Sequence, residues 1–401
     1  MGPRRALVAG GVVIMAGYLC LAFPARAGAA IGLVLVAAGT GLYKPNHLAL
    51  INLLFGDRAR REAGISLIYT SIQASALLAP LVIGYLGERV RWQWAFLAAA
   101  AVLAVCVVQL VVAGRRLGPL GDAPGRPLGS VPRRLWFAPL VLVVPVAAWI
   151  VFGVTGAIAV VALASVLAPF AGYRRLGSAL APAARTRLRA FLWVFSGSAL
   201  FWMIAAQDGS VLALFARDLT DRTLFGMEVP VSWLPAATPL FVLFLAPAAA
   251  WALPRMGGLP LKFSLGLLCA GGSFLLLIVP ALASASGRVS VGWLLAVYLL
   301  HACGELIIAA VGIAATADVV PAAYLSQALG LWWLFAALGG GLGSQLARVV
   351  EVLGHPVYFF ALGTVVTVTG LVMMARRHAI TRALSHPDDV ADPAPMKPSR
   401  A

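Results

Sequence analysis

The sequence predicts an all-α membrane protein that crosses the bilayer about 12 times. Three observations predict this class. The chain of 401 residues is 62% hydrophobic and only 11% charged, whereas an ordinary soluble domain is about a quarter charged. Apolar runs of about 17 to 25 residues, the length of a membrane span, recur along the chain. The arginines gather in the short loops between these runs, which is typical of cytoplasmic loops.

Each apolar run is expected to form one helix, because about 20 helical residues cross the hydrocarbon core of a bilayer. The expected spans cover approximately residues 6–23, 29–55, 64–86, 92–114, 135–152, 154–172, 190–215, 235–253, 261–283, 290–316, 324–347 and 356–376. With the N-terminus inside, most of the 30 basic residues fall in cytoplasmic segments. We therefore expect a multi-pass protein of the plasma (inner) membrane with both termini in the cytoplasm.

Composition and motifs exclude several other classes of protein. Lys+Arg number 30 against 14 Asp+Glu, but the basic residues are spread over loops, whereas a nucleic-acid site needs them on one face. The cysteines lie in apolar spans without C-x-x-C spacing, so neither a disulfide framework nor a metal site is indicated. With no H-E-x-x-H, G-x-S-x-G or phosphate-binding motif, we expect neither an enzyme nor a cofactor. The first span could also be read as a signal peptide, but the spans after it favour a membrane helix.

Two basic segments, residues 115–134 and 173–189, divide the chain. They enclose an uncharged pair of spans in which Gly153 and Gly156 are the expected turn. We predict an incomplete helical bundle over residues 1–114, an inserted hairpin with its linkers over 115–189, a six-helix bundle over 190–378 and a disordered cytoplasmic tail over 379–401. Counting spans alone would instead join the hairpin to the first four helices, which gives six plus six.

Two ionisable residues of opposite sign lie in the middle of expected spans. Lys44 belongs to GTGLYKPN (residues 39–46) and Glu305 to LHACGEL (residues 300–306). A charge at the centre of a bilayer costs about 2.5 to 3.5 kcal/mol on insertion scales, and such residues usually mark a substrate or ion path. One hypothesis is that the two side chains face a hydrated cavity and hold both ends of a zwitterionic solute. The alternative is a structural ion pair that only joins the two halves.

Two more titratable residues accompany these charges. His301 lies four residues before Glu305, on the same face of the helix, and could tune the proton affinity of the glutamate or shuttle protons. The alternative is a hydrogen-bonded core histidine. Asp208 lies near the outer end of its span, and we expect it to be solvated at the extracellular mouth.

Three tryptophans, Trp202, Trp332 and Trp333, fall within spans rather than at the membrane interfaces where tryptophan is enriched. They could line pockets for the side chains of a solute, and core packing explains them equally well. Residues 339–343 (GGGLG) would let two helix backbones approach closely and could also form a bending point.

Six segments occur in an order typical of one known family. Residues 39–46 fit G-x-G-x-x-K-P-N, residues 57–64 (DRARREAG) fit an acidic and arginine-rich turn, and residues 68–77 (IYTSIQASAL) fit F-Y-x-x-I-N-x-G-S-L. Residues 201–222, 300–312 and 330–334 continue the pattern. Over nearly its whole length the chain resembles the proton-coupled oligopeptide transporters, a branch of the major facilitator superfamily, with these segments matching its helices four, five, seven, ten and eleven.

The resemblance implies the major facilitator superfamily fold, arranged as four helices, an inserted pair and six helices. It also implies uptake of di- or tripeptides or related solutes together with protons, by alternating access. Lys44 would bind the peptide carboxylate and Glu305 the amine. Asn46 and Trp202 would line the same cavity. Together with the residues considered above, the predicted substrate-binding residues are Lys44, Asn46, Tyr43, Gln73, Trp202, Glu305 and Trp332, and the predicted proton-coupling residues are Glu305 and His301. The expected partners are thus a small peptide, protons and the lipid bilayer.

The chain also departs from the family pattern. Its first match is to the third helix, so about two helices and their E-x-x-E-R motif are missing. The seventh-helix glutamate is Ala206, the fifth-helix asparagine is Gln73, and Thr238 replaces another asparagine. In the family that glutamate pairs with the first-helix arginine, so the loss of both strands no buried charge. Asp208 would point at a different neighbour, because two residues turn an α-helix through about 200°.

These departures leave three interpretations open. The chain could be a start-site truncation of a longer transporter, a shortened relative with altered or lost transport, or a non-transporting membrane partner. We expect any transport to be weakly coupled to protons or uncoupled, because Ala206 and the missing first helix remove expected coupling groups.

Overall fold

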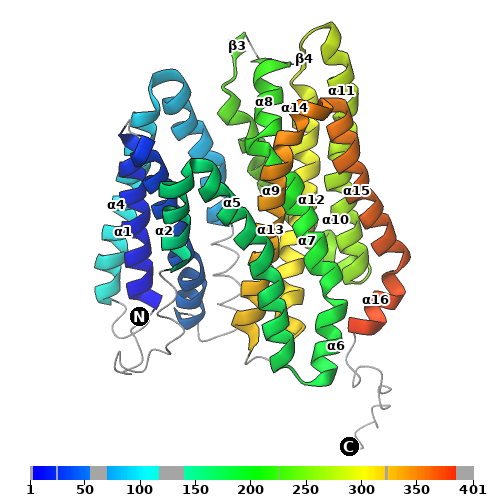
Figure 1. The fold of residues 1–401 in the computed structure, drawn as a ribbon. Coiled ribbons are helices and arrows are strands. Elements are labelled where there is room, and N and C mark those ends of the chain that lie inside the picture. The colour runs from blue at the N-terminus through cyan, green and yellow to red at the C-terminus, as the bar shows by residue number, and fades with distance from the viewer. Residues whose placement is uncertain are drawn as a thin grey trace, which may run out of the picture. The chain divides into compact units, whose positions relative to one another are not determined.

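The computed structural model describes residues 3–23, 26–54, 70–116, 140–224, 226–320 and 324–384, and most of them are helical (Figure 1). Eight helices within these ranges are long and apolar enough to cross a membrane. The all-α membrane class is thus confirmed. The chain forms two compact units. Unit 1 comprises residues 1–163 and 223–243, and unit 2 comprises residues 164–222 and 244–401.

Unit 1 is built on the first helices of the chain. Its long helices are α1 (Pro3–Ala22), α2 (Arg26–Leu54), the span Thr70–Val90 and α4 (Trp92–Arg116). The end of Thr70–Val90 consists of two π-helical segments, η1 (Pro80–Gly84) and η2 (Leu86–Val90). A short hairpin follows in unit 1, with β2 (Thr223–Leu224) paired to β3 (Met227–Glu228), and it leads into η6 (Val231–Ala236) and the start of α9 (Ala237–Ala252).

Glycines bring α1 and α2 into close contact. A Cβ on Gly10 would lie 2.9 Å from the carbonyl oxygen of Gly39, and one on Gly17 would lie 2.8 Å from that of Gly32. Small residues at such crossings let two backbones approach, which drives helix association in membranes. Gly39, which belongs to the GTGLYKPN segment, therefore has a packing role, whereas a Cβ on Gly41 would meet nothing within 4 Å.

Of the two glycines in the expected turn, Gly153 interrupts the helix. Helix α5 (Leu140–Ala179) is interrupted there by a left-handed residue with φ 72°. A side chain disfavours this conformation, so glycine is the residue that permits the break. The end of α5, from residue 164 on, belongs to unit 2 and contacts α13 (Leu325–Leu346), where the ring of Phe170 meets that of Phe335 edge-on at 6.1 Å.

Unit 2 contains most of the buried apolar residues among those that the structure describes. After the end of α5, its α-helices are α6 (Pro182–Ala190), α7 (Leu192–Ala205), α8 (Val211–Asp218), the end of α9, α10 (Leu259–Leu276), α11 (Ile278–Ala283), α12 (Gly292–Asp318), α13, α14 (Val350–Leu353), α15 (His355–Ala375) and α16 (Arg377–Leu384). Short 3₁₀ segments between them are η5 (Ala206–Gly209), η7 (Leu253–Arg255), η8 (Ser284–Ser286) and η10 (Ala347–Val349). Two short strands are β1 (Thr220–Asp221) and β4 (Val289–Ser290). Strands β1 and β4 pair in parallel. Helix α7 packs on α13, while α10 packs on both α12 and α15.

In unit 1, the end of the span Thr70–Val90 is fastened to η6. The Glu88 carboxylate accepts hydrogen bonds from the backbone N–H groups of Val231 (3.1 Å) and Ser232 (2.7 Å). The indole of Trp233 donates to the carbonyl of Leu81 at 3.1 Å. Gly84 allows this approach, because a Cβ there would overlap the side chain of Ser232.

We expect Glu88→Gln to loosen this attachment. The amide can accept only one of the two bonds on its oxygen in the same geometry, and hydrogen bonds to a charged group contribute about 1.5 to 3 kcal/mol. Hydrogen exchange of the Val231 and Ser232 amides should therefore become faster, while exchange in α10 stays unchanged. Glu351→Gln on α14 is the control, since this exposed carboxylate lies in unit 2. Unchanged protection of both amides in Glu88→Gln would contradict the prediction.

Candidate functional site

The first group of predicted site residues lies in unit 1. Tyr43, Lys44 and Asn46 follow one another on α2, with Lys44 exposed and the other two half-buried. Asn46 donates its side-chain amide to the carbonyl of Leu42 at 2.7 Å, so its helix fixes the direction of that side chain. Gln73 is buried in the helical residues 70–79.

The second group lies in unit 2, where α12 crosses α7 and α10. Glu305 is half-buried on α12, directly after Gly304. A Cβ on Gly304 would lie 2.9 Å from the ring of Phe201 on α7 and 3.1 Å from the carbonyl oxygen of Gly266 on α10. Because Gly304 has no side chain, three helices meet at this level, and the backbone that carries Glu305 is held there.

Trp202 lies on α7 beside this crossing. Its ring meets that of the adjacent Phe201 edge-on at 5.4 Å, and the side chain is half-buried. The indole Nε1 is buried and has no hydrogen-bond partner among the described residues. A buried donor without a partner is costly, so a ligand or water that accepts from it would be favoured.

Trp332 is placed differently from Trp202. It is 1% exposed, and its ring meets that of Phe263 edge-on at 6.3 Å. Gly312 on α12 makes room for it, because a Cβ there would overlap the indole ring. Trp332 thus packs in the core of unit 2 in this conformation, and its role in substrate binding stays a prediction. Its neighbour Trp333 is exposed.

His301 belongs to a buried polar chain. The side chain is 1% exposed, and its Nδ1 lies 3.0 Å from the Oδ1 of Asp208, whose side chain is 19% exposed. Its Nε2 lies 3.0 Å from the Oγ of Ser273 on α10, and Ser273 donates to the carbonyl of Ala270 at 2.6 Å. The neighbouring Gln207 is fully buried and donates to the carbonyl of Gly343 on α13 at 2.9 Å.

The expectation that Asp208 is solvated at the mouth of its span is therefore wrong. Helix α7 ends at Ala205, and residues 206–209 continue as the 3₁₀ segment η5. A 3₁₀ segment turns about 120° per residue rather than 100°, so Asp208 and residue 206 do not share a direction. The expectation that Asp208 meets a different neighbour agrees with the structure, which identifies that neighbour as His301.

The sequence analysis missed Ser273 and the pairing of Asp208 with His301. Both titratable residues lie in long apolar spans, and that placement was the available signal, because buried ionisable groups are usually paired. Asp208 and His301 are far apart in the chain, so the periodicity of residues within one helix cannot predict that they contact each other. A serine such as Ser273, which also bonds its own helix, gives no local signal.

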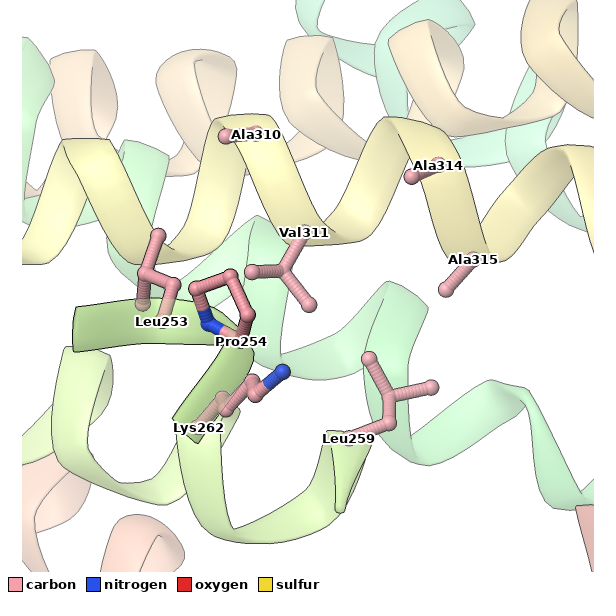
Figure 2. A pocket seen from close by; sticks show the side chains of 8 residues that line it. All are labelled: Leu253, Pro254, Leu259, Lys262, Ala310, Val311, Ala314 and Ala315. Atoms are coloured by element: carbon pink, nitrogen blue, oxygen red, sulfur yellow. The ribbon is translucent and has the colours of Figure 1, made fainter. Parts of the chain in front are cut away.

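A pocket of about 390 Å³ lies elsewhere in unit 2 (Figure 2). Its lining side chains come from η7, α10 and α12 and are apolar except for Lys262: Leu253, Pro254, Leu259, Lys262, Ala310, Val311, Ala314 and Ala315. Figure 2 shows the Lys262 side chain between Pro254 and Leu259. None of the predicted site residues lines this pocket.

Comparison with known proteins identifies relatives over nearly the whole chain. The chain is 31% identical to the uncharacterized transporter YclF of Bacillus subtilis, over 96% of this chain and 80% of that protein. It is 25% identical to a di-/tripeptide transporter of Lactococcus lactis subsp. cremoris, over 96% of this chain and 82% of the relative.

Solved structures agree with these sequence relatives. The peptide transporter POT in complex with sulfate has a TM-score of 0.88 at 32% identity and covers 96% of this chain, which covers 82% of that one. A POT family transporter in complex with 5-aminolevulinic acid has a TM-score of 0.88 at 27% identity, with 95% and 82% covered. The POT family model (PTR2) matches residues 4–358. The chain therefore belongs to the POT family of transporters and has the major facilitator superfamily fold, as the resemblance of its motifs predicted.

Proposed function

We propose that this chain transports di- and tripeptides or related small zwitterionic solutes across the plasma (inner) membrane by alternating access, in symport with protons. The observation that carries the proposal is the pair of opposite charges in apolar helices. Lys44 is exposed on α2 in unit 1, and Glu305 is half-buried on α12 in unit 2. Ionisable residues within membrane helices usually mark a substrate or ion path, and a zwitterionic solute offers each of these two residues a charge of the opposite sign.

The chemistry of known relatives supports this substrate class. The Lactococcus relative is named a di-/tripeptide transporter. POT transporter structures have been solved with alafosfalin, with 5-aminolevulinic acid and with a thioalcohol-conjugated peptide. A site that accepts such ligands needs a cation for an acid group, an anion for an amine and a lining that tolerates different side chains.

Individual roles follow from the residue types. Lys44 would bind the peptide carboxylate and Glu305 the amine, and Glu305 would also take up a proton. The buried N–H of Trp202, which lacks a partner among the described residues, would donate to a peptide carbonyl. Asn46, Tyr43, Gln73 and Trp332 complete the proposed lining. Both termini would lie in the cytoplasm.

Counterflow tests this proposal without depending on coupling. Purified protein in liposomes loaded with unlabelled dialanine should accumulate external labelled dialanine, because exchange needs no net driving force. Trialanine should compete, and free alanine should compete poorly, because it has no peptide carbonyl to accept from the N–H of Trp202. Liposomes without protein set the background. Absence of counterflow with every di- and tripeptide tested would overturn the proposal and favour a non-transporting membrane partner.

A further inference from the structure

Unit 2 has a basic end that peptide transport does not explain. It consists of residues 173–189, 254–262 and 376–384, which contain ten Lys and Arg residues and no Asp or Glu. We propose that this basic end binds an anionic phospholipid, with the phosphate at Lys262 and one acyl chain in the apolar pocket of Figure 2. The inference goes beyond the proposed function and stands whether or not the chain transports peptides.

The three segments of the basic end lie together in the fold. Helix α16 packs against both α6 and α10 (Figure 1). A Cβ on Gly258 would lie 3.6 Å from the Oγ1 of Thr381 on α16. Arg185 joins α6 to the end of α5, because its guanidinium donates to the carbonyls of Gly177 (2.7 Å) and Leu180 (3.2 Å). Basic residues are typical of the cytoplasmic side of a membrane protein, and the cytoplasmic leaflet carries anionic lipids.

Most cations of the basic end have no acidic partner. Among the described residues, no carboxylate forms an ion pair with Arg174, Arg175, Arg187, Arg189, Arg376 or Arg377. The Nε of Arg187 is buried and has no hydrogen-bond partner in the described part of the chain. Cations gathered in this way repel one another, and an anion nearby relieves the repulsion. Guanidinium groups bind phosphate oxygens with strong, charge-assisted hydrogen bonds, so a phosphate is the anion that this end suits.

The pocket adds an apolar surface to these charges. Its volume is about 390 Å³, and every lining side chain except that of Lys262 is apolar. Helix α12 contributes only small or β-branched side chains to the lining, namely Ala310, Val311, Ala314 and Ala315. These four are exposed or half-buried, so the pocket is open to a ligand. An exposed apolar groove with a polar rim is typical of a binding surface, and a hydrocarbon chain is the ligand that matches this lining.

The depth of the lining residues gives the pocket a direction. Lys262 lies three residues after the first residue of α10, about 4.5 Å along the helix axis. Ala310 lies eight residues before the last residue of α12, about 12 Å along that axis. The two helices run in opposite directions, because Gly266 meets Ile308 while Ser273 meets His301. The pocket therefore starts near the basic end and continues toward the middle of the span, as an acyl chain does below its phosphate.

Lys262 is placed to meet the headgroup. It is half-buried, and Figure 2 shows its side chain between Pro254 and Leu259. No described residue forms an ion pair or hydrogen bond with it. Lysine buries its hydrocarbon stem along apolar surface and keeps its ammonium group at the polar boundary. The order of groups in the pocket, a cation followed by an apolar channel, is thus the order of groups in an anionic phospholipid.

A neighbouring tryptophan marks the same level of the membrane. Trp251 is 65% exposed near the end of α9, and the guanidinium of Arg255 lies 4.5 Å from the centre of its ring. Tryptophan is enriched where a membrane protein meets the headgroups. Arg255 follows directly after Pro254, which lines the pocket. The pocket and its lysine therefore lie at the level where phospholipid phosphates are found.

Lipid binding can be measured directly by native mass spectrometry of the detergent-solubilised protein. We expect dioleoyl-phosphatidylglycerol to bind and dioleoyl-phosphatidylcholine, which has the same chains and no net charge, to bind weakly. Lys262→Ala should lower the affinity for phosphatidylglycerol about fivefold, the effect of one cation near an anionic headgroup, and Lys262→Glu should lower it further. Arg348→Ala is the control, since this exposed cation lies on η10, outside the basic end. Equal binding of the two lipids would overturn the proposal.

Two further arms test the pocket itself. Ala314→Trp places a large side chain in the pocket and should reduce phosphatidylglycerol binding, while gel filtration and the thermal midpoint show that the variant folds. Inorganic phosphate should fail to displace the lipid, because phosphate gains nothing from the apolar lining. Displacement by phosphate at the concentration of the lipid, or unchanged binding in both Lys262→Glu and Ala314→Trp, would refute the lipid site. Peptide selectivity should stay unchanged in Lys262→Ala, because none of the proposed peptide-binding residues lines the pocket.

Discussion

Gly339→Ala is expected to disrupt the packing of α7 on α13, whereas Gly340→Ala, one residue later, is expected to leave it intact. A Cβ on Gly339 would overlap the backbone carbonyl of Ala199 on α7. A Cβ on Gly340 would meet nothing within 4 Å. The obstacle at Gly339 is backbone, so a change of rotamer cannot relieve it, and the two helices must move apart.

The pair of variants separates steric strain from helix propensity. Both replace glycine by alanine in the same helix, and that change alone favours the helix by about 0.5 to 1 kcal/mol. Overpacking typically costs about 1 to 3 kcal/mol and occasionally more. We therefore expect Gly339→Ala to lower the thermal midpoint of the detergent-solubilised protein clearly, and Gly340→Ala to keep or raise it.

A functional consequence should accompany the loss of stability. Gly343 packs on α7 as well, with a Cβ placed there lying 2.5 Å from the carbonyl oxygen of Met203. Separation of α7 from α13 would also pull on the bond from Gln207 to Gly343 (2.9 Å), next to Asp208. Dialanine counterflow should fall in Gly339→Ala and not in Gly340→Ala. Equal thermal midpoints and equal counterflow in the two variants would show that this contact does not hold the unit together.

The sequence predicted helices well where the signal is local. The expected spans 92–114, 290–316 and 356–376 correspond to Trp92–Arg116, Gly292–Asp318 and His355–Ala375. Apolar length is a property of one segment, so hydropathy locates such spans. The expected span 190–215 instead contains α7, the 3₁₀ segment η5 and α8. No proline or run of charges marks the change from α-helix to 3₁₀-helix at Ala206. The hydrogen bond from Gln207 to Gly343 on α13 stabilises this segment, and a contact of this kind cannot be predicted from one helix alone.

Glycine roles were only partly predictable. Residues 339–343 were expected to allow close helix approach, and Gly339 and Gly343 do so. Composition could not tell which glycines face the neighbouring helix, since Gly340 meets nothing within 4 Å. The same limit applies to tryptophans. Trp332 and Trp333 are adjacent in sequence, yet one is buried and the other exposed, because neighbouring residues on a helix point about 100° apart.

The largest functional effect is expected from Glu305→Gln and Lys44→Ala, measured with chemically matched peptides. Charge-assisted hydrogen bonds contribute about 1.5 to 3 kcal/mol, which corresponds to roughly tenfold to a hundredfold in apparent affinity. Glu305→Gln keeps the shape of the side chain and removes its charge. Its uptake of dialanine should fall by this factor, while folding, followed by gel filtration, stays intact.

The matched peptides identify which end of the substrate each residue holds. N-acetyl-dialanine lacks the amine, and dialanine amide lacks the carboxylate. Wild-type protein should prefer dialanine to both. Glu305→Gln should no longer distinguish dialanine from N-acetyl-dialanine, but should still prefer dialanine to dialanine amide. Lys44→Ala should no longer distinguish dialanine from dialanine amide, but should still prefer dialanine to N-acetyl-dialanine. The reason is that each variant removes one of the two charges proposed to bind the substrate. Two controls carry the same charge changes elsewhere, Glu351→Gln on α14 and Lys262→Ala in the pocket of Figure 2. If both variants fold and keep both preferences, Lys44 and Glu305 are structural charges and the peptide binds elsewhere.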